Sequence, residues 1–183
     1  MSAAIGGHLA ALLARGEFVV TGEIVPPVAG ATASITEHAV ALIGSVDAVN
    51  LTDNPTATPH MSPVAAVAAT TAAGIEPTIQ LTVRDRNRLA LTGDLLGAWA
   101  LGARNLFCLS GDPIHVGDHA EAAVVGDLDV NGLIALARRM REHGTPLLLV
   151  EPLERRDAHG FHHSRKRGPA ARREIAVRSL SHA

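Results

Sequence analysis

Short apolar runs alternate along the chain with segments in which apolar residues recur every three or four positions. The apolar runs are rich in Val, Ile and Leu and predict β-strands. These strands are expected at about residues 18–24, 47–52, 76–83, 105–110 and 146–151. The segments with the longer period predict α-helices. They lie within residues 1–18 and at about residues 34–44, 63–73, 86–101 and 129–143.

Residues at the expected helix ends support these positions. Ser34 and Glu37 have the spacing of a capping box. Ser62 followed by Pro63 is typical of an N-cap and a first helical residue, and Gly74 is a suitable stop for the same helix.

The expected strands recur at a regular interval. The first four begin near residues 18, 47, 76 and 104, about 29 residues apart, which is the length of a βαβ unit. Near-continuous apolar strands favour a parallel sheet, so the fold class is α/β. A chain of 183 residues suits an open doubly wound sheet, because an eight-stranded barrel needs about 250 residues. Length alone therefore favours the open sheet.

Charge divides the chain into two unequal parts. Residues 1–154 carry 8 basic and 16 acidic residues, whereas residues 155–183 carry 8 basic and 2 acidic residues. The second part has no periodic apolar face and is expected to be a disordered basic tail. Its histidines lack the carboxylate or thiol partners of a metal site, and it lacks the aromatic residues of a nucleic-acid reader. We therefore expect no metal and no nucleic acid.

The cysteine content and the hydropathy pattern indicate the cellular compartment. Cys108 is the single cysteine, which excludes an internal disulfide and suits a reducing cytoplasm. No apolar run approaches the roughly 18 residues of a membrane span. A cytoplasmic protein without a membrane partner is expected.

Every expected strand ends in polar residues. Functional groups gather at the carboxyl ends of parallel strands in both barrels and open sheets. Strands also simply stop where apolar residues stop, which is the alternative for any one position. The residues at these ends are Glu23, Thr52, Asp53, Asn54, Gln80, Thr82, Arg84, Asp85, Ser110, Gly111, Asp112 and Glu151.

Two carboxyl groups are candidates for chemistry. Glu23 stands between β-branched residues and two prolines, a rigid setting in which partial desolvation raises a carboxyl pKa towards that of a general acid. The alternative is an exposed strand-end glutamate. Asp112 follows Gly111, where the backbone can turn or approach a ligand, and could accept hydrogen bonds from an amide-rich ring. The alternative is that Asp112 begins a turn.

Positive charge concentrates where the third strand meets the next helix. Arg84, Asp85, Arg86 and Arg88 lie at this junction, and a helix N-terminus attracts anions. These arginines therefore predict a phosphate or diphosphate ligand. In the alternative, Asp85 caps the helix and the arginines pair with nearby acids. The sequence has no P-loop and no GxGxxG segment.

Several of these segments together resemble one family. The segments "GEIVPP", "VNLTDNP", "MSP", "RDRNRLALTGDLLGA", "LSGDP" and "GDHAEAAVVGDLD" are similar in order and register to the methylenetetrahydrofolate reductases. They are most similar to the form fused to homocysteine methyltransferases. The resemblance covers about residues 15–142 and implies an eight-stranded βα barrel, against the preference from length. About five βα units of it are expected in residues 1–154.

The resemblance also implies an activity. Family members use FAD, reduced by NAD(P)H or another donor, to convert 5,10-methylenetetrahydrofolate to 5-methyltetrahydrofolate in one-carbon and methionine metabolism. Glu23 matches the family's general acid, and Asp112 matches an aspartate beside the folate pterin and the flavin. The positions that match the flavin lining are Thr52, Gln80, Thr82, Leu109, Ser110 and Gly111. For Arg84, Asp85, Arg86 and Arg88 the resemblance implies a place near the flavin phosphates or ribityl chain.

The chain departs from the family pattern in two places. Relatives often carry a lysine and an aromatic residue where this sequence has Ala123 and Gly126. The resemblance fades after His143, before the last three barrel strands. An inactive remnant, or a non-catalytic fragment that binds flavin or folate, is therefore the alternative function. A homo-oligomer or a separate subunit is expected to complete the barrel.

Overall fold

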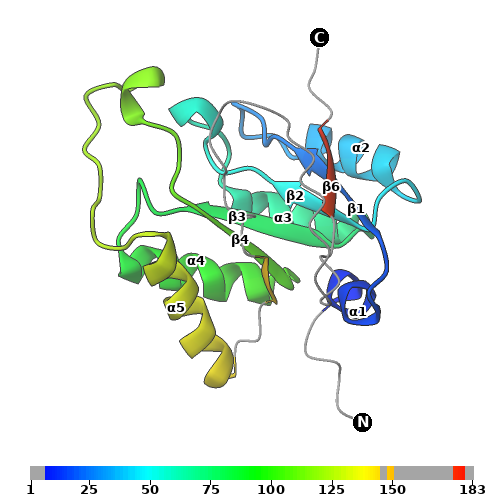
Figure 1. Cartoon of the computed structure of the whole chain (residues 1–183). Coiled ribbons are helices and arrows are strands. Elements are labelled where there is room, and N and C mark those ends of the chain that lie inside the picture. The colour runs from blue at the N-terminus through cyan, green and yellow to red at the C-terminus, as the bar shows by residue number, and fades with distance from the viewer. Residues whose placement is uncertain (1–6, 145–147, 151–174, 180–183) are drawn as a thin grey trace, which may run out of the picture.

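Six parallel strands form one sheet in the computed structural model, which describes residues 7–144, 148–150 and 175–179 (Figure 1). The order across the sheet is β5-β4-β3-β2-β1-β6. The strands are β1 Val19–Ile24, β2 Ala48–Leu51, β3 Pro77–Thr82, β4 Asn105–Leu109, β5 Leu148–Val150 and β6 Ile175–Ser179. The first five strands occur where the apolar runs predict them.

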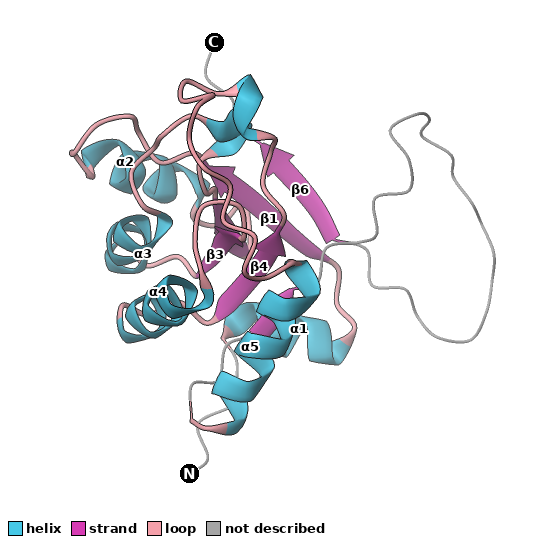
Figure 2. Cartoon of the chain, turned by 90° about the vertical axis from the view of Figure 1, so that its left-hand side faces the viewer, coloured by secondary structure: helices cyan, strands magenta, loops and turns pink. Residues whose placement is uncertain are grey.

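Helices α2 to α5 cover one face of this sheet. The helix α2 packs against α3, α3 against α4, and α4 against α5. Figure 2 shows α2, α3 and α4 side by side along the sheet. The helices are α1 His8–Arg15, α2 Ala33–Leu42, α3 Pro63–Ala72, α4 Arg88–Ala100 and α5 Val130–Glu142, with short 3₁₀ turns η1 Pro55–Ala57 and η2 Ile114–Val116. Among the described helices, none has the length and apolar character to span a bilayer.

The strand order decides between the two architectures. Strands β1 to β5 are neighbours in chain order, so every crossover steps in the same direction. Right-handed crossovers that all step one way place their helices on one face. A doubly wound sheet reverses direction and covers both faces. The open doubly wound sheet favoured by length is therefore wrong, and the arrangement is that of a partial βα barrel.

Strand β6 is an addition that the sequence pattern did not reveal. It pairs in parallel with β1, from Val19 with Ile175 to Glu23 with Ser179. It lies within residues 155–183, where the sequence predicts no regular structure. The pairing partner is more than 150 residues away along the chain, so no local pattern reports it. The division at residue 154 remains a prediction.

The helix ends agree with the prediction in one case and differ in two. The Ser62 hydroxyl accepts the Val64 N–H at 3.3 Å, and Pro63 is the first residue of α3, as predicted. The capping box is wrong, because α2 begins before Ser34, at Ala33, and its N-cap Thr32 makes no side-chain cap.

The start of α4 also differs from the prediction. This helix begins at Arg88 and not at Arg86. Its cap is Asn87, whose side-chain oxygen accepts the Ala90 N–H at 3.0 Å. Asp85 is therefore not the helix cap, which corrects one part of the alternative drawn from the sequence.

The register of the sheet separates an apolar row from a polar row. Ile24, Leu51, Ile79 and Leu106 pair in sequence across four strands, and all belong to the main hydrophobic core. The adjacent row of paired residues is polar and consists of Glu23, Asn50, Thr78 and Asn105. Because side chains alternate between the faces of a strand, the two rows point to opposite faces. The face covered by α2 to α5 is thus the main core, and the other face carries this polar row, with a smaller apolar cluster of Val19 and Ala48 under α1.

Helix α4 offers a matched test of this core. Leu91 is 0% exposed in the core, whereas Leu89 is 78% exposed on the same helix. We expect Leu91→Ala to lower the free energy of unfolding by about 2–5 kcal/mol, because it leaves a cavity. We expect Leu89→Ala to change it by less than about 0.5 kcal/mol. Urea unfolding followed by the emission of Trp99, the single tryptophan, measures both. Equal losses in the two variants would contradict this position of the core.

Candidate functional site

A cavity of about 360 Å³ opens at the carboxyl ends of β1 to β4. Eight of the candidate catalytic or flavin-lining residues line it together. They are Glu23, Thr52, Gln80, Thr82, Leu109, Ser110, Gly111 and Asp112. Asp53, Pro55 and Pro113 complete the wall. We call this the strand-end cavity. Glu151 lies outside the described residues.

Glu23 and Gln80 face each other across β2. Glu23 is half-buried near the end of β1, and Gln80 is buried in β3. The Gln80 Nε2 donates to the Glu23 Oε2 at 3.5 Å, the long limit of a hydrogen bond. Among the described residues, the other carboxyl oxygen of Glu23 accepts no hydrogen bond, and Glu23 lines the cavity.

Two threonine hydroxyls of the same wall are buried and unpaired. The Oγ1 atoms of Thr52 and Thr82 have no hydrogen-bond partner among the described residues, and the two residues are 5% and 1% exposed. A buried polar group without a partner costs about 1–3 kcal/mol. Each hydroxyl can donate one hydrogen bond and accept others. The cavity wall therefore holds unused hydrogen-bonding capacity.

Asp112 is held at the rim of the cavity by its side chain and by its main chain. Its Oδ2 accepts the Thr56 N–H at 2.7 Å, and its carbonyl accepts from the Arg84 Nη1 at 3.0 Å. The carboxyl group itself is exposed. Gly111 before it has a φ of +85°, and an added Cβ would lie 3.0 Å from the Arg84 Cβ. Glycine is needed there for both reasons.

Asp53 is a site residue to which the sequence assigned no role. Its side chain is 0% exposed, its Oδ2 accepts the Thr82 N–H at 2.7 Å, and its Oδ1 accepts from Arg86 at 2.5 Å. The carboxylate thus joins the ends of β2 and β3 to the segment before α4. The only sequence signal was its place in "LTDNP", directly after an apolar strand.

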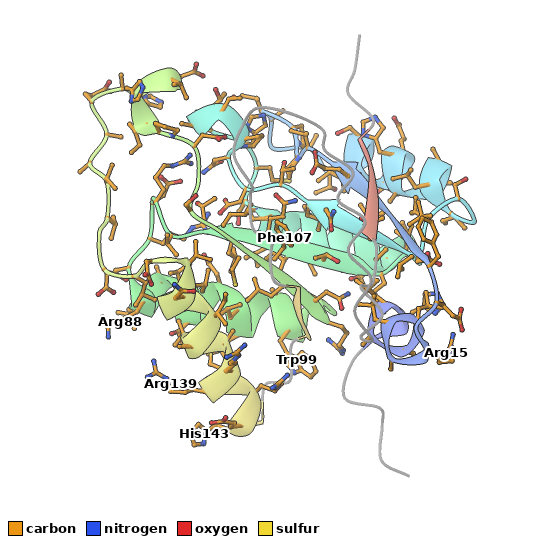
Figure 3. All side chains as sticks on the ribbon, in the orientation of Figure 1. Arg15, Arg88, Trp99, Phe107, Arg139 and His143 are labelled. Atoms are coloured by element: carbon orange, nitrogen blue, oxygen red, sulfur yellow. The ribbon has the colours of Figure 1, made fainter. Side chains whose placement is uncertain are left out.

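The clustered arginines are each paired with an aspartate. Arg84 binds Asp85 through Nε at 2.6 Å and Nη2 at 2.7 Å. Arg86 binds Asp53 and lies 3.4 Å from Asp94, and Arg88 binds Asp127 at 2.8 Å. This is the pairing with acids that the sequence left open as an alternative. Figure 3 shows Arg88 at the outer end of α4, whereas Phe107 lies in the middle of the sheet.

These pairs fix the protonation of their members. The hydrogen bond from Arg84 holds the pKa of Asp85 below its usual range, and the same bond raises the pKa of Arg84. Burial opposes the charge on Arg86, but its hydrogen bond to Asp53 and the surrounding aspartates outweigh burial and raise its pKa. Positive charge is therefore balanced within the cluster. Arg86 and Arg88 line neither cavity at this end of the sheet, and their place beside a cofactor remains a prediction.

Arg84 lines a second cavity of about 260 Å³. Its lining comes from the loops after β2, β3 and β4, namely Asn54, Ala57, Pro59, Arg84, Asp85, Ile114, His119, Ala122 and Ala123. Its floor includes a strained turn, because Asn54, Thr56 and Ala57 have φ values of 45°, 54° and 55°. Such strain persists only where surrounding contacts impose it, and it is common at functional sites.

The long segment between β4 and α5 is attached at several points to the site. The Val125 N–H donates to the Arg84 carbonyl at 2.8 Å. Asp127 accepts the Arg88 N–H at 2.7 Å in addition to the guanidinium contacts. Gly117 approaches the Ala57 backbone so closely that a Cβ there would lie 2.0 Å from the Ala57 carbonyl oxygen. The segment therefore closes over the loops after β2 and β3.

A one-directional parallel sheet with a polar cavity at the carboxyl ends of its strands defines a protein of the βα-barrel class. Comparison with families narrows the class: the sequence model described as "Methylenetetrahydrofolate reductase" matches residues 8–150. The chain belongs to the methylenetetrahydrofolate reductase family, whose domain is a TIM barrel. A comparison with curated proteins finds no match. Membership supports an oxidoreductase-like role in folate one-carbon metabolism.

Asp53 and Asp94, the two acidic partners of Arg86, should differ in their contribution to stability. We expect Asp53→Ala to lower the free energy of unfolding by about 3–5 kcal/mol, because it leaves a largely buried guanidinium without its main partner. Asp94 is 32% exposed and lies farther from the same arginine, so Asp94→Ala should cost less than about 1 kcal/mol. Urea unfolding of both variants measures the difference. A loss for Asp94→Ala as large as that for Asp53→Ala would contradict this assignment.

The Arg88–Asp127 pair predicts a pH dependence. The hydrogen bonds from Arg88 lower the pKa of Asp127 to about 2. A carboxyl pKa that is lower in the folded chain adds stability above the unfolded value of about 3.9, and this stability is lost as pH falls through the folded value. The melting temperature of the wild type should therefore exceed that of Asp127→Asn at pH 5, and the gap should close towards pH 2. The exposed Asp118 makes no such pair among the described contacts, so Asp118→Asn should show no gap at either pH. A gap for Asp127→Asn that stays constant with pH would contradict the pairing.

Proposed function

We propose that the chain is a flavin-dependent oxidoreductase that reduces 5,10-methylenetetrahydrofolate to 5-methyltetrahydrofolate. The product is the methyl donor for methionine synthesis, and we propose a cytoplasmic location. One observation carries the proposal: the strand-end cavity gathers Glu23, Asp112 and two unpaired threonine hydroxyls in a member of the methylenetetrahydrofolate reductase family.

The residues of this cavity fit a flavin ring. A volume of about 360 Å³ is at the lower end of the roughly 300–1,000 Å³ of small-molecule sites, which suits one ring system rather than a whole dinucleotide. The ring of a flavin carries carbonyls and a ring N–H. The buried hydroxyls of Thr52 and Thr82 and the amide of Gln80 offer matching donors and acceptors. We assign Leu109, Ser110 and Gly111 to the wall beside the ring.

The second cavity suits the polar part of the cofactor beyond the ring. It is lined by Arg84, and Asn54 and His119 add polar groups. Because Asp85 balances the charge of Arg84, we propose that this part is held by hydrogen bonds more than by net positive charge. Arg86 and Arg88 would act there indirectly, by fixing the loops around the cavities.

FAD bound at this site would supply the hydride for the reduction, with NAD(P)H as its proposed electron donor. The contribution of the chain is to move a proton and to hold the folate. We assign Glu23 as the acid that protonates N10 of the folate as the bond from N10 to the methylene carbon breaks. The electron pair of that bond stays on N10, the methylene carbon remains bonded to N5 as an iminium, and addition of hydride makes it a methyl group.

Asp112 is assigned to the rim, where its carboxylate can accept hydrogen bonds from the folate pterin. Its exposure leaves one carboxyl oxygen free of the contact with Thr56. Glu23 and Asp112 line the same cavity from different strands, β1 and the loop after β4. This arrangement allows one residue to bind and the other to transfer a proton.

Replacement of Glu23 tests the proposal directly. The purified chain should retain FAD with a shifted visible absorbance band after free flavin is removed, and it should turn over the folate. Glu23→Gln should retain the flavin but lose about 10²- to 10⁴-fold in turnover, because an amide cannot donate the proton. The exposed Glu37 on α2 provides the control, and Glu37→Gln should leave turnover unchanged. Folded wild type that retains no flavin would contradict the proposal.

A non-catalytic fragment that binds flavin or folate is the second candidate. It is favoured by the described sheet, in which β5 and β6 each pair with one neighbour only. Association with a second copy or a separate subunit would cover these edges. Flavin retention without turnover by the wild type at every chain concentration, with turnover that appears only when a separate subunit is added, would select this candidate.

A further inference from the structure

Arg84 occupies a buried position between the loops that follow β2, β3 and β4. It is 7% exposed, and its guanidinium makes contacts with all three loops. We propose that Arg84 is a positioning residue that holds Asp112 at the rim of the strand-end cavity. The functional part of this inference rests on the proposed role of Asp112.

Burial of the Arg84 charge is possible because its partner is the next residue along the chain. Asp85 accepts two hydrogen bonds from the guanidinium, from Nε and from Nη2. Such paired hydrogen bonds fix the plane of the guanidinium as well as its charge. The Nη1 edge is therefore aimed in a set direction, towards the loop after β4.

The fixed guanidinium then holds Asp112 along two routes. In the first, Arg84 Nη1 donates to the Asp112 carbonyl at 3.0 Å. In the second, Arg84 Nη2 donates to the Asn54 carbonyl at 3.4 Å, at the start of the strained turn. That turn presents the Thr56 N–H, which donates to the Asp112 Oδ2 at 2.7 Å. One side chain thus sets both the main chain and the carboxylate of Asp112.

The close packing of Gly111 on Arg84 supports this role. A Cβ at Gly111 would lie 3.0 Å from the Arg84 Cβ and 3.2 Å from the Thr82 Cβ. The backbone just before Asp112 is therefore seated directly on the arginine. Lysine has a single ammonium group and cannot reproduce the planar set of donors. Arg84→Lys should consequently behave as a loss of function despite the retained charge.

A double-mutant cycle measured by amide hydrogen exchange tests whether Arg84 positions Asp112, and it needs neither flavin nor turnover. Asp112→Ala removes the acceptor of the Thr56 N–H and should speed exchange at Thr56 roughly tenfold, the effect of losing one hydrogen bond to a charged group. Arg84→Gln should speed it to a similar degree, and the double variant should add less than twofold. Amides of β3 and β4, such as those of Leu81 and Leu106, should keep their wild-type protection.

Turnover provides the second readout. Arg84→Gln should lower kcat by about ten- to a hundredfold, because a displacement of Asp112 by about 1 Å lowers the rate by up to about a hundredfold. In an Asp112→Asn background, Arg84→Gln should lower kcat by less than twofold. Arg139, which is exposed on α5 and lines neither cavity, supplies a control that removes the same charge. Arg139→Gln should leave both readouts unchanged.

A further variant distinguishes the positioning role of Arg84 from a loss of folding. Arg84→Gln leaves Asp85 without its partner, so Arg84→Gln/Asp85→Asn, which removes both charges, should fold and still show fast exchange at Thr56. Independent, multiplying effects of Arg84→Gln and Asp112→Ala on exchange would overturn the inference, as would equal loss of protection at Leu81 and Leu106. A positive exchange cycle in a chain without turnover would instead overturn the proposed function and keep Arg84 as the residue that holds Asp112.

Discussion

Parallel pairing in register places residues that share a row on the same face of the sheet, and the site depends on this constraint. One row, from Ile24 to Leu106, is apolar and packs under the helices. The next row, from Glu23 to Asn105, is polar and points to the opposite face. A shift of one residue in any strand would exchange the two rows. The core and the cavity wall are therefore two results of a single pairing pattern.

Pairs of opposite charge then fix the loops that the sheet presents. Asp53 ties β2 to the backbone of β3 and to Arg86, and Arg84 ties the loop after β3 to Asn54 and Asp112. Each arginine at this junction is balanced by an aspartate, so the cluster adds little net charge to the site. What the cavity offers to a ligand is mainly hydrogen bonding, from unpaired hydroxyls and from carboxyl groups held in place.

A site that offers hydrogen bonds and carboxyl groups is consistent with the proposed chemistry, in which the cofactor supplies the electrons. The protein needs to hold a flat ring, place one acid beside the folate and exclude water. Glu23 on a strand and Asp112 on a loop held by Arg84 meet the first two needs in the proposed function. The segment from Pro113 to Leu128 is attached to the neighbouring loops through Val125 and Asp127.

The sequence by itself determined the first five strands, the helices and the polar strand ends, because apolar runs and a period of 3.6 residues are local properties of the chain. It also identified the family and most residues that line the strand-end cavity. The resemblance to the family also predicted the barrel architecture, which chain length alone did not, and the strand order confirms it. Only the tertiary structure revealed β6. It alone paired Arg86 with Asp53 and Arg88 with Asp127, 33 and 39 residues apart. Such pairs form between loops that only the folded sheet brings together, so no local pattern of residues can report them.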